Sequence, residues 1–175
     1  MQKQMEWELT GLFSIAALVE ARDPYTVGHA WRVSRYCRLV AENSVQSEEV
    51  IAQVAIAGFL HDLGKIGIAD AVLLSPARLS PADYAVVKEH AALGARLLVG
   101  HPLADLIGDV VRHHHERFDG TGYPDGLAAQ KIPLGARIVA VCDAFDAMTS
   151  TRPWRKALPL EMALATIEAG YGTQF

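Results

Sequence analysis

The chain has 175 residues, of which 51% are hydrophobic, and a formal net charge of -4. This length favours one core and therefore one domain. The acidic balance and the lack of a basic run exclude a nonspecific nucleic-acid binder, so any recognition of phosphate should be local.

Cysteine usage and the start of the chain bear on the cellular compartment. The two cysteines, Cys37 and Cys142, lie in apolar helical patterns without Cys-x-x-Cys spacing, which argues against a disulfide framework or a thiolate zinc site. The first residues lack the features of a signal peptide, and the apolar runs are interrupted short of the roughly 20 residues that cross a bilayer. We therefore expect a soluble, cytoplasmic protein with no membrane segment.

The first two predicted helices contain one candidate ligand. Residues 7–22 carry apolar side chains on nearly every side, so we expect other parts of a longer protein, or a second copy of the chain, to cover this helix. Asp23-Pro24 then predicts an N-cap and a first helical position for a helix that runs to about Glu42. His29 shares the inward face of that helix with Val33, Cys37 and Val40.

Two further helices are predicted in the middle of the chain. Ser47, followed by two glutamates, predicts the start of a helix whose inward face reaches His61. Residues 64–79 are predicted to form an irregular connection, because their glycines permit tight turns. Ser80 opens a capping box with proline at the first helical position. The helix after it is expected to point inward with Tyr84, Val87, His90, Gly94 and Leu97.

A cluster of histidines ends the next predicted helix. Pro102 opens this helix, and a single apolar stripe that includes Leu106 runs along it to His114. His113 and His115 lie about 100° to either side of His114. We treat His113 as structural.

The last third of the chain predicts a loop and two helices. Residues 116–126 must form a structured loop, because three glycines and a proline crowd this run. Pro133 starts a helix with Asp143 on its inward face, and a final helix runs from Pro159 to about Ala169. No strand-like alternation is present, so the predicted fold is all-α, a bundle of about six or seven helices.

Titratable residues recur on helix faces that are otherwise apolar. Taken singly, a histidine on such a face is more often a hydrogen-bonded core residue than a ligand, and an aspartate often only caps or pairs. Here such residues occur on five predicted helices, which makes a purely structural role for all of them less plausible. The candidates are His29, His61, Asp62, His90, His114 and Asp143, with His115 as a seventh member.

This ligand set favours a dinuclear metal site. Five imidazoles and two carboxylates exceed the needs of one tetrahedral zinc site and suit two six-coordinate ions that share a carboxylate. Nitrogen and oxygen ligands of this kind favour iron, manganese, cobalt or nickel over zinc and disfavour magnesium. Two close ions lower the pKa of bound water, so that hydroxide forms at neutral pH. They also stabilise the attacking and leaving oxygens of an in-line displacement at phosphorus. We therefore expect hydrolysis of a phosphate ester.

Two motifs carry a family resemblance. H-D-L-G-K at 61–65 resembles the HD superfamily of metal-dependent phosphohydrolases, and H-H-E-R-F-D-G-T-G-Y-P at 114–124 is similar to the signature of its HD-GYP subgroup. The resemblance runs from about Asp23 to the end, and it includes residues 132–149 and R-P-W-R at 152–155. It implies an HD-superfamily helical bundle around a dinuclear metal site.

The resemblance also implies a division of the chain. We expect residues 23–175 to form an HD-GYP domain that ends earlier than family members normally do. Residues 1–22 would then be an N-terminal helix that links to an upstream sensory or receiver domain or forms a homodimer contact.

By this resemblance the reaction is hydrolysis of cyclic di-GMP to pGpG or GMP. The seven candidates above match the metal ligands of the family, and Asp62 matches the one that bridges the ions. Lys65 matches the lysine that contacts the scissile phosphate and assists proton transfer. Arg152 and Arg155 match positions that hold substrate phosphates, although exposed loop charges often have no such role.

The loop motif has two interpretations. Gly122, Tyr123 and Pro124 would lie on the substrate side, or they would contact a diguanylate cyclase domain. Tyr123 is equally well explained as a turn residue that holds the loop. Glu116 and Asp119 are expected to orient ligand histidines or the loop itself.

The sequence departs from the family pattern at two positions, and it leaves other functions open. Tyr25 stands where some members carry a glutamate for a third metal, so we expect two ions, and Trp154 replaces the usual tyrosine. The alternative function is a regulatory module of low turnover that binds cyclic di-GMP or a cyclase domain through the GYP loop. The complete ligand set favours the enzyme. Hydrolysis of another nucleotide and di-iron oxygenation form a third possibility, against which the GYP segment argues.

Overall fold

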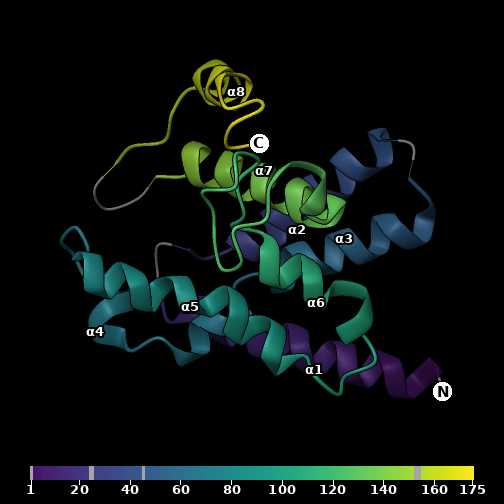
Figure 1. The fold of residues 1–175 in the computed structure, drawn as a ribbon. Helices are drawn as coiled ribbons and strands as arrows, with labels where there is room; N and C mark the ends of the chain where they lie inside the picture. Colours follow the sequence, from purple (N-terminus) through teal and green to yellow (C-terminus); the bar gives the residue numbers. More distant parts are fainter. Residues whose placement is uncertain (1, 24–25, 45, 152–154) are drawn as a thin grey trace.

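The computed structural model describes residues 2–23, 26–44, 46–151 and 155–175, and Figure 1 shows them as a helical bundle. Within these ranges the regular elements are α-helices and short 3₁₀-helices, with no strand. The predicted all-α fold is confirmed. One helix more is present than the sequence predicts, because a single turn, α4 (Asp70–Leu73), forms within the stretch expected to be irregular.

Helix α3 (Glu48–Leu60) lies at the centre of the bundle. It packs against α2 (His29–Asn43), α6 (Ala104–His113) and α7 (Leu134–Thr149), and α1 (Gln2–Ala21) also contacts it. Its buried side chains include Val54, Ala57, Phe59 and Leu60. Burial of a large apolar side chain contributes roughly 1.5–3 kcal/mol, so this helix anchors the core.

The same helix belongs to the most apolar part of the chain. Among the described residues, the segment Glu48–Gly67 is long and apolar enough to cross a membrane by length and composition alone. Half of it is buried inside the protein. Its contacts with α2, α6 and α7 account for its apolar composition as that of a core helix.

A close backbone contact positions the segment after α3. This segment forms η1 (Leu63–Gly67), which packs against α5 (Pro81–Leu97). A Cβ atom at Gly64 would overlap the carbonyl oxygen of His90, so only glycine allows the two backbones to approach this closely. The contact brings the residue before η1, Asp62, beside the middle of α5.

Two of the three predicted side-chain N-caps are confirmed. The Ser47 hydroxyl accepts a hydrogen bond from the backbone N–H of Val50, and the Ser80 hydroxyl accepts one from that of Asp83 at 3.1 Å. Each side chain satisfies an N–H group that has no partner within its helix.

The predicted start of α2 is wrong. The helix begins at His29, after Gly28 with a φ of 79°, and Asp23 does not cap it. The carboxylate of Glu20 instead accepts hydrogen bonds from the backbone N–H groups of Gly28 and Ala30. Local capping rules missed this because the capping group belongs to a different helix. The predicted first helical residue, Pro24, lies outside the described residues.

Some residues predicted to face inward are exposed instead. Val40, Tyr84, Leu97 and Leu106 are 38%, 50%, 47% and 43% exposed, whereas Leu98 is fully buried. A helix turns by about 100° per residue, so a small rotation about its axis exchanges neighbours between the buried and exposed sides. Packing against other helices decides that rotation.

Among the described elements, the C-terminal helix packs mainly against one neighbour. Helix α8 (Leu160–Ala169) packs against α7 and lies at the top of the view in Figure 1. The chain then turns back, and the carbonyl oxygens of Thr173 and Gln174 accept hydrogen bonds from the backbone N–H groups of Asp119 and Phe118. The C-terminal residues thus support the loop that follows α6.

Candidate metal centre

All seven predicted ligands lie together at the centre of the fold. Their side chains form three overlapping groups in which the ligand atoms lie within 4.8 Å of one another. They come from the start of α2, the end of α3, the middle of α5, the end of α6 and the middle of α7. The residues are His29, His61, Asp62, His90, His114, His115 and Asp143.

The first group contains His29, His61 and Asp143. The Nε2 atoms of the two imidazoles are 3.3 Å apart. Asp143 Oδ1 lies 3.3 Å from the Nε2 atom of His29 and 4.0 Å from that of His61. Three ligand atoms from three different helices therefore surround one point.

The second group contains His90, His114 and His115. The Nε2 atoms of His90 and His114 are 3.3 Å apart. The ring centroid of His115 lies 5.0 Å from that of His90 and 4.1 Å from that of His114. His90 and His114 are 1% exposed, so this group lies in the interior.

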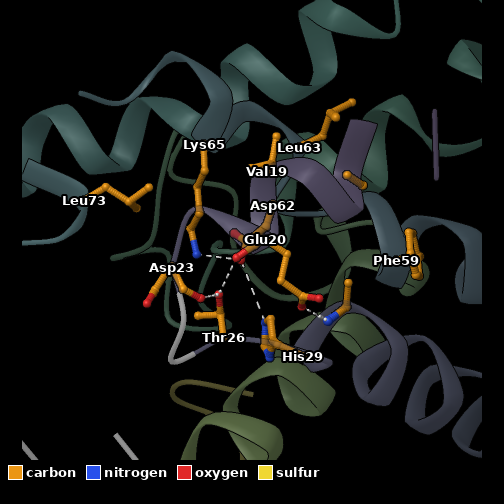
Figure 2. A pocket seen from close by; sticks show the side chains of 12 residues that line it. Val19, Glu20, Asp23, Thr26, His29, Phe59, Asp62, Leu63, Lys65 and Leu73 are labelled. Carbon is orange, nitrogen blue, oxygen red and sulfur yellow. Dashed lines mark hydrogen bonds and ion pairs between the residues drawn. The ribbon is translucent and has the colours of Figure 1, made fainter. Parts of the chain in front are cut away.

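Asp62 connects the two groups. Its Oδ2 atom lies 3.4 Å from Nε2 of His61, in the first group, and its Oδ1 atom lies 3.4 Å from Nε2 of His90, in the second. The Oδ2 atom also contacts the ammonium of Lys65, as Figure 2 shows. One carboxylate thus faces both groups with different oxygens.

The hydrogen bonds of the imidazoles show what these sites can accept. The Nδ1 atoms of His61, His90 and His114 bond the backbone carbonyls of Gly58, Val87 and Val111 at 2.8, 2.6 and 2.7 Å. A carbonyl can only accept, so the proton of each neutral ring is on Nδ1 and the Nε2 lone pair points into the centre. Two such lone pairs 3.3 Å apart repel each other unless a cation lies between them. The residues therefore fit divalent metal ions.

Sequence reasoning missed two residues that hold His29. Asp146 is fully buried, and its Oδ2 atom accepts a hydrogen bond from Nδ1 of His29 at 2.7 Å. Arg32 donates to the same carboxylate from Nε at 2.6 Å and from Nη2 at 3.0 Å. Carboxylates of this kind orient a ligand imidazole and raise its basicity. The available signal was the position of Asp146, one helical turn after Asp143.

The charges in the centre set the ionisation of its groups. Burial opposes ionisation of Asp62, but Lys65 and the neighbouring imidazoles outweigh it and hold its pKa well below the usual value. Asp143 behaves in the same way, with His29 as the main stabilising partner that lowers its pKa. Both carboxylates are therefore anionic at neutral pH.

The pKa values of His29 and of the histidines of the second group are shifted in opposite directions. Burial lowers the pKa of His29, but the carboxylates of Asp143 and Asp146 outweigh burial and raise it to about 9. Burial, together with the neighbouring His90, lowers the pKa of His115 to about 3. The pKa of His114 is also lowered, mainly by burial. The second group is therefore neutral over a wide range of pH.

The loop after α6 is clamped to the helix. The buried carboxylate of Glu116 accepts hydrogen bonds from the backbone N–H groups of Asp125 and Leu127 at 2.7 and 3.1 Å. Asp125 in turn pairs with Arg112 and accepts a hydrogen bond from Nε2 of His113. Glu116 thus supports the loop rather than a ligand imidazole, and His113 has a structural role.

The GYP motif lies within this clamp. The ring of Tyr123 stacks on that of His115 with centroids 4.8 Å apart. A Cβ atom at Gly122 would overlap the backbone of Glu116, so the loop folds back on itself at this glycine. Asp119 accepts hydrogen bonds from Arg117 and from Thr121, which fixes the turn between them.

A cleft of about 1170 Å³ opens on the metal centre. His29, Asp62, Lys65, His115 and Asp143 form its floor, and the segment from Val72 to Val87 forms one wall. Sequence reasoning did not select that wall. Its lining residues are Val72, Leu73, Ser75, Pro76, Ala77, Arg78, Leu79, Ser80, Pro81, Tyr84 and Val87.

The other predicted substrate residues do not line this cleft or are outside the described part of the chain, although Tyr123 stacks on His115 of the cleft floor. The residues that line the cleft do not include Gly122, Tyr123, Pro124 or Arg155. The guanidinium of Arg155 donates to the carbonyl of Ala147, near the end of α7. Arg152, Trp154 and Tyr25 lie outside the described residues.

Fold and site together define the class of protein. It is an all-helical domain with a buried centre of imidazoles and carboxylates suited to divalent cations. A family model described as an HD domain matches residues 14–175. The chain belongs to the HD domain family, and the motif at 114–124 places it in the HD-GYP subgroup. Membership implies binding of divalent metal ions, for which the His and Asp groups are the candidates.

Named relatives and a solved structure resemble the chain. The "Cyclic di-GMP phosphodiesterase response regulator RpfG" of Xanthomonas campestris pv. campestris is 42% identical over 100% of this chain and 47% of its own length. A "Cyclic di-GMP phosphodiesterase" of Thermotoga maritima is 42% identical over 87% of this chain and 42% of its own length. The chain spans about half the length of these curated relatives.

The structural comparison supports the fold. The crystal structure of the cyclic GMP-AMP specific phosphodiesterase V-cGAP3 of Vibrio cholerae superposes with a TM-score of 0.69 at 19% identity. The superposition covers 94% of this chain and 45% of that one. At this identity the likeness concerns the fold alone.

Proposed function

We propose that the chain is a phosphodiesterase domain that hydrolyses cyclic di-GMP to pGpG or GMP with two divalent ions. The observation that carries the proposal is the pair of ligand groups joined by Asp62 on the floor of the large cleft. The names of the two relatives given above support cyclic di-GMP as the substrate.

The proposed ligands are divided between the two ions. His29, His61 and Asp143 would hold one ion, and His90, His114 and His115 the other, with Asp62 bridging them. Iron, manganese, cobalt or nickel is proposed in preference to zinc, because the ligands are imidazoles and carboxylates in excess of a tetrahedral set. Magnesium is disfavoured by the number of imidazoles.

The residues of the chain have defined tasks in this reaction. When bound, two divalent cations lower the pKa of water and stabilise charge during in-line displacement at phosphorus. Water loses a proton to the solvent and attacks phosphorus as hydroxide, and the bond between phosphorus and the leaving ribose oxygen breaks. Lys65, on the cleft floor beside Asp62, contacts the scissile phosphate and donates a proton to that oxygen. Buried hydrogen bonds to backbone carbonyls keep the imidazoles from turning.

The cleft wall has the chemistry of a nucleotide site. Its apolar side chains and the half-exposed ring of Tyr84 offer flat surfaces to a purine base. Arg78 adds a cation on the same wall, and an arginine can bind a phosphate or the O6 and N7 edge of guanine. Arg152, Arg155, Gly122, Tyr123 and Pro124 are further proposed contacts of the substrate.

The remaining proposals concern protein partners and the cellular location. Helix α1 exposes Trp7 and Leu18, which are 77% and 70% exposed. This supports the proposal that α1 contacts an upstream domain or a second copy of the chain. A diguanylate cyclase domain at the GYP loop and a cytoplasmic location are proposed from the sequence pattern.

Product analysis tests the proposal. The protein, loaded with manganese or with iron under anaerobic conditions, is incubated with cyclic di-GMP, and the products are separated by chromatography. We expect pGpG or GMP from the wild type and none from Asp62→Ala, because the shared ligand is lost. Intact substrate with both proteins would refute the enzyme. Tight binding without product would support the regulatory module instead, and preferred turnover of 3′3′-cGAMP would correct the substrate.

A further inference from the structure

The C-terminal end of α1 and the residue after it contact the backbone on two sides of the metal centre. Glu20 lies in the last turn of α1 and Arg22 directly follows the last helical residue, Ala21, and neither belongs to the predicted site. Glu20 binds the start of α2, which carries His29, and Arg22 binds η1, which carries Lys65. The two residues therefore reach a metal ligand and a proposed catalytic group through their main chains.

Glu20 takes the place of a missing N-cap. Gly28 at the N-cap position has no side chain that could accept a hydrogen bond. The Oε2 atom of Glu20 accepts from the N–H of Gly28 at 3.0 Å, and its Oε1 atom accepts from the N–H of Ala30 at 2.7 Å. These N–H groups flank His29, so the carboxylate fixes the main chain on both sides of the ligand. Figure 2 shows Glu20 reaching toward this turn beside Asp62 and His29.

Arg22 binds the end of η1 with its whole guanidinium group. Its Nη1 atom donates to the carbonyl of Lys65 at 2.9 Å, and its Nη2 atom donates to the carbonyl of Ile68 at 2.7 Å. Nε and Nη2 also donate to one carboxylate oxygen of Asp70, at 3.2 and 2.6 Å. The carbonyl of Lys65 also accepts a hydrogen bond from the backbone N–H of Ile68 at 3.0 Å, so Arg22 adds a second donor to the carbonyl that closes η1.

Packing anchors the rest of α1 to the bundle. Ala16 and Val19 are buried, and the ring of Phe13 contacts that of Phe59 on α3 with centroids 4.8 Å apart. The part of helix α1 from Phe13 to Val19 is thus packed against the core. A displacement of this helix would reach His29 and Lys65 together.

We propose that Glu20 and Arg22 are positioning residues through which the placement of α1 sets the geometry of the metal centre. Glu20 acts on the first ligand group through His29, and Arg22 acts on Lys65. The part that concerns turnover rests on the proposed phosphodiesterase function. The part that concerns metal binding does not.

Metal titration tests the role of Glu20. In Glu20→Ala we expect the affinity of the first group to fall by about 10- to 100-fold, as for other residues that orient a ligand, while the second group keeps its ion. Elemental analysis after gel filtration should then find one of the two ions lost. Glu42→Ala removes an exposed glutamate that pairs with the exposed Arg38 and serves as the matched control.

The outcomes for Glu20 are separable from a folding defect. Glu20→Gln keeps one acceptor oxygen for two N–H groups, so its loss of metal affinity at the first group should be smaller. If Glu20→Ala does not fold, Glu20→Gln takes its place in the test. Equal loss from both groups, or no loss from either, overturns the role of Glu20. Neither measurement needs turnover, so failure of the proposed reaction would leave this test intact.

Kinetics and spectroscopy test the role of Arg22. Misplacement of a catalytic group by about 1 Å can lower the reaction rate by about 10²-fold. Because Arg22 holds the backbone of Lys65, Arg22→Ala should lower kcat by about that factor while both ions are retained. Arg22→Lys should restore part of it, and Arg38→Ala, at an exposed site, should match the wild type. The NMR signal of ¹³C-methylated Lys65 should shift in Arg22→Ala whether or not substrate is turned over. An unshifted signal with wild-type kcat overturns the role of Arg22.

Discussion

Removal of the Asp146 carboxylate should weaken both the fold and the first metal group. The side chain is fully buried and accepts three close hydrogen bonds, one from His29 and two from Arg32. Asp146→Ala leaves all three donors without their acceptor. Breaking a buried charged pair costs about 3–5 kcal/mol, to be discounted here because the Arg32 side chain is 38% exposed.

We therefore expect a loss of about 3 kcal/mol in the free energy of unfolding of the metal-free protein. In a chain of 175 residues this corresponds to a fall in Tm of about 6–12 °C. The stability of Asp146→Asn should lie between those of the wild type and Asp146→Ala. One amide oxygen replaces two acceptor oxygens, and the amide N–H groups would face the donors of His29 and Arg32. Both variants should also bind the first ion about 10- to 100-fold more weakly.

The assay is thermal unfolding of the metal-free protein, followed by metal titration. Asp109→Ala removes an exposed carboxylate from α6 and should change the stability by less than about 0.5 kcal/mol. Burial raises the pKa of Asp146, but His29 and Arg32 outweigh it and hold the pKa below the usual value. The stabilisation is thus fully present at neutral pH and is lost only as the pH falls through that lowered pKa. An Asp146→Ala protein with wild-type Tm and metal affinity would refute the reasoning.

Two further predictions concern acid and packing. Metal should leave in two steps as the pH is lowered from 9, because the metal-free pKa of His29 is about 9 and that of His115 about 3, so protons compete at the first group well before the second. Elemental analysis after dialysis at graded pH measures this, and loss of both ions at one pH contradicts it. Gly64→Ala should cost about 3 kcal/mol or more in denaturant unfolding, because its Cβ would overlap the backbone of α5. Gly108→Ala, where a Cβ meets open space, should be neutral or stabilising by about 0.5–1 kcal/mol, and equal behaviour of the two variants would contradict the packing argument.

Sequence patterns predicted the helices well where the signals were local. Ser47 and Ser80 cap the helices that they were expected to start, because a cap depends on a few neighbouring residues. The start of α2 could not be predicted in this way. Its N–H groups are satisfied by Glu20, which only the tertiary fold brings beside Gly28.

The same distinction holds for the metal centre. Apolar periodicity was enough to select His29, His61, His90, His114 and Asp143 as inward residues, since a titratable group on a buried face needs a partner. Their division into two groups around Asp62 depends on distances between helices, which no periodicity contains.

The sequence by itself determined the helical class, the family motifs and the identity of the candidate ligands, because each of these depends on residue type and spacing along the chain. Only the tertiary structure decided that Asp146 and Arg32 hold His29, that the segment from Val72 to Val87 walls the cleft, and that Arg22 binds the backbone of Lys65. These contacts join residues far apart in sequence. They exist because the packing of α1, α2, α5 and α7 brings those residues together, and packing is a property of the whole bundle.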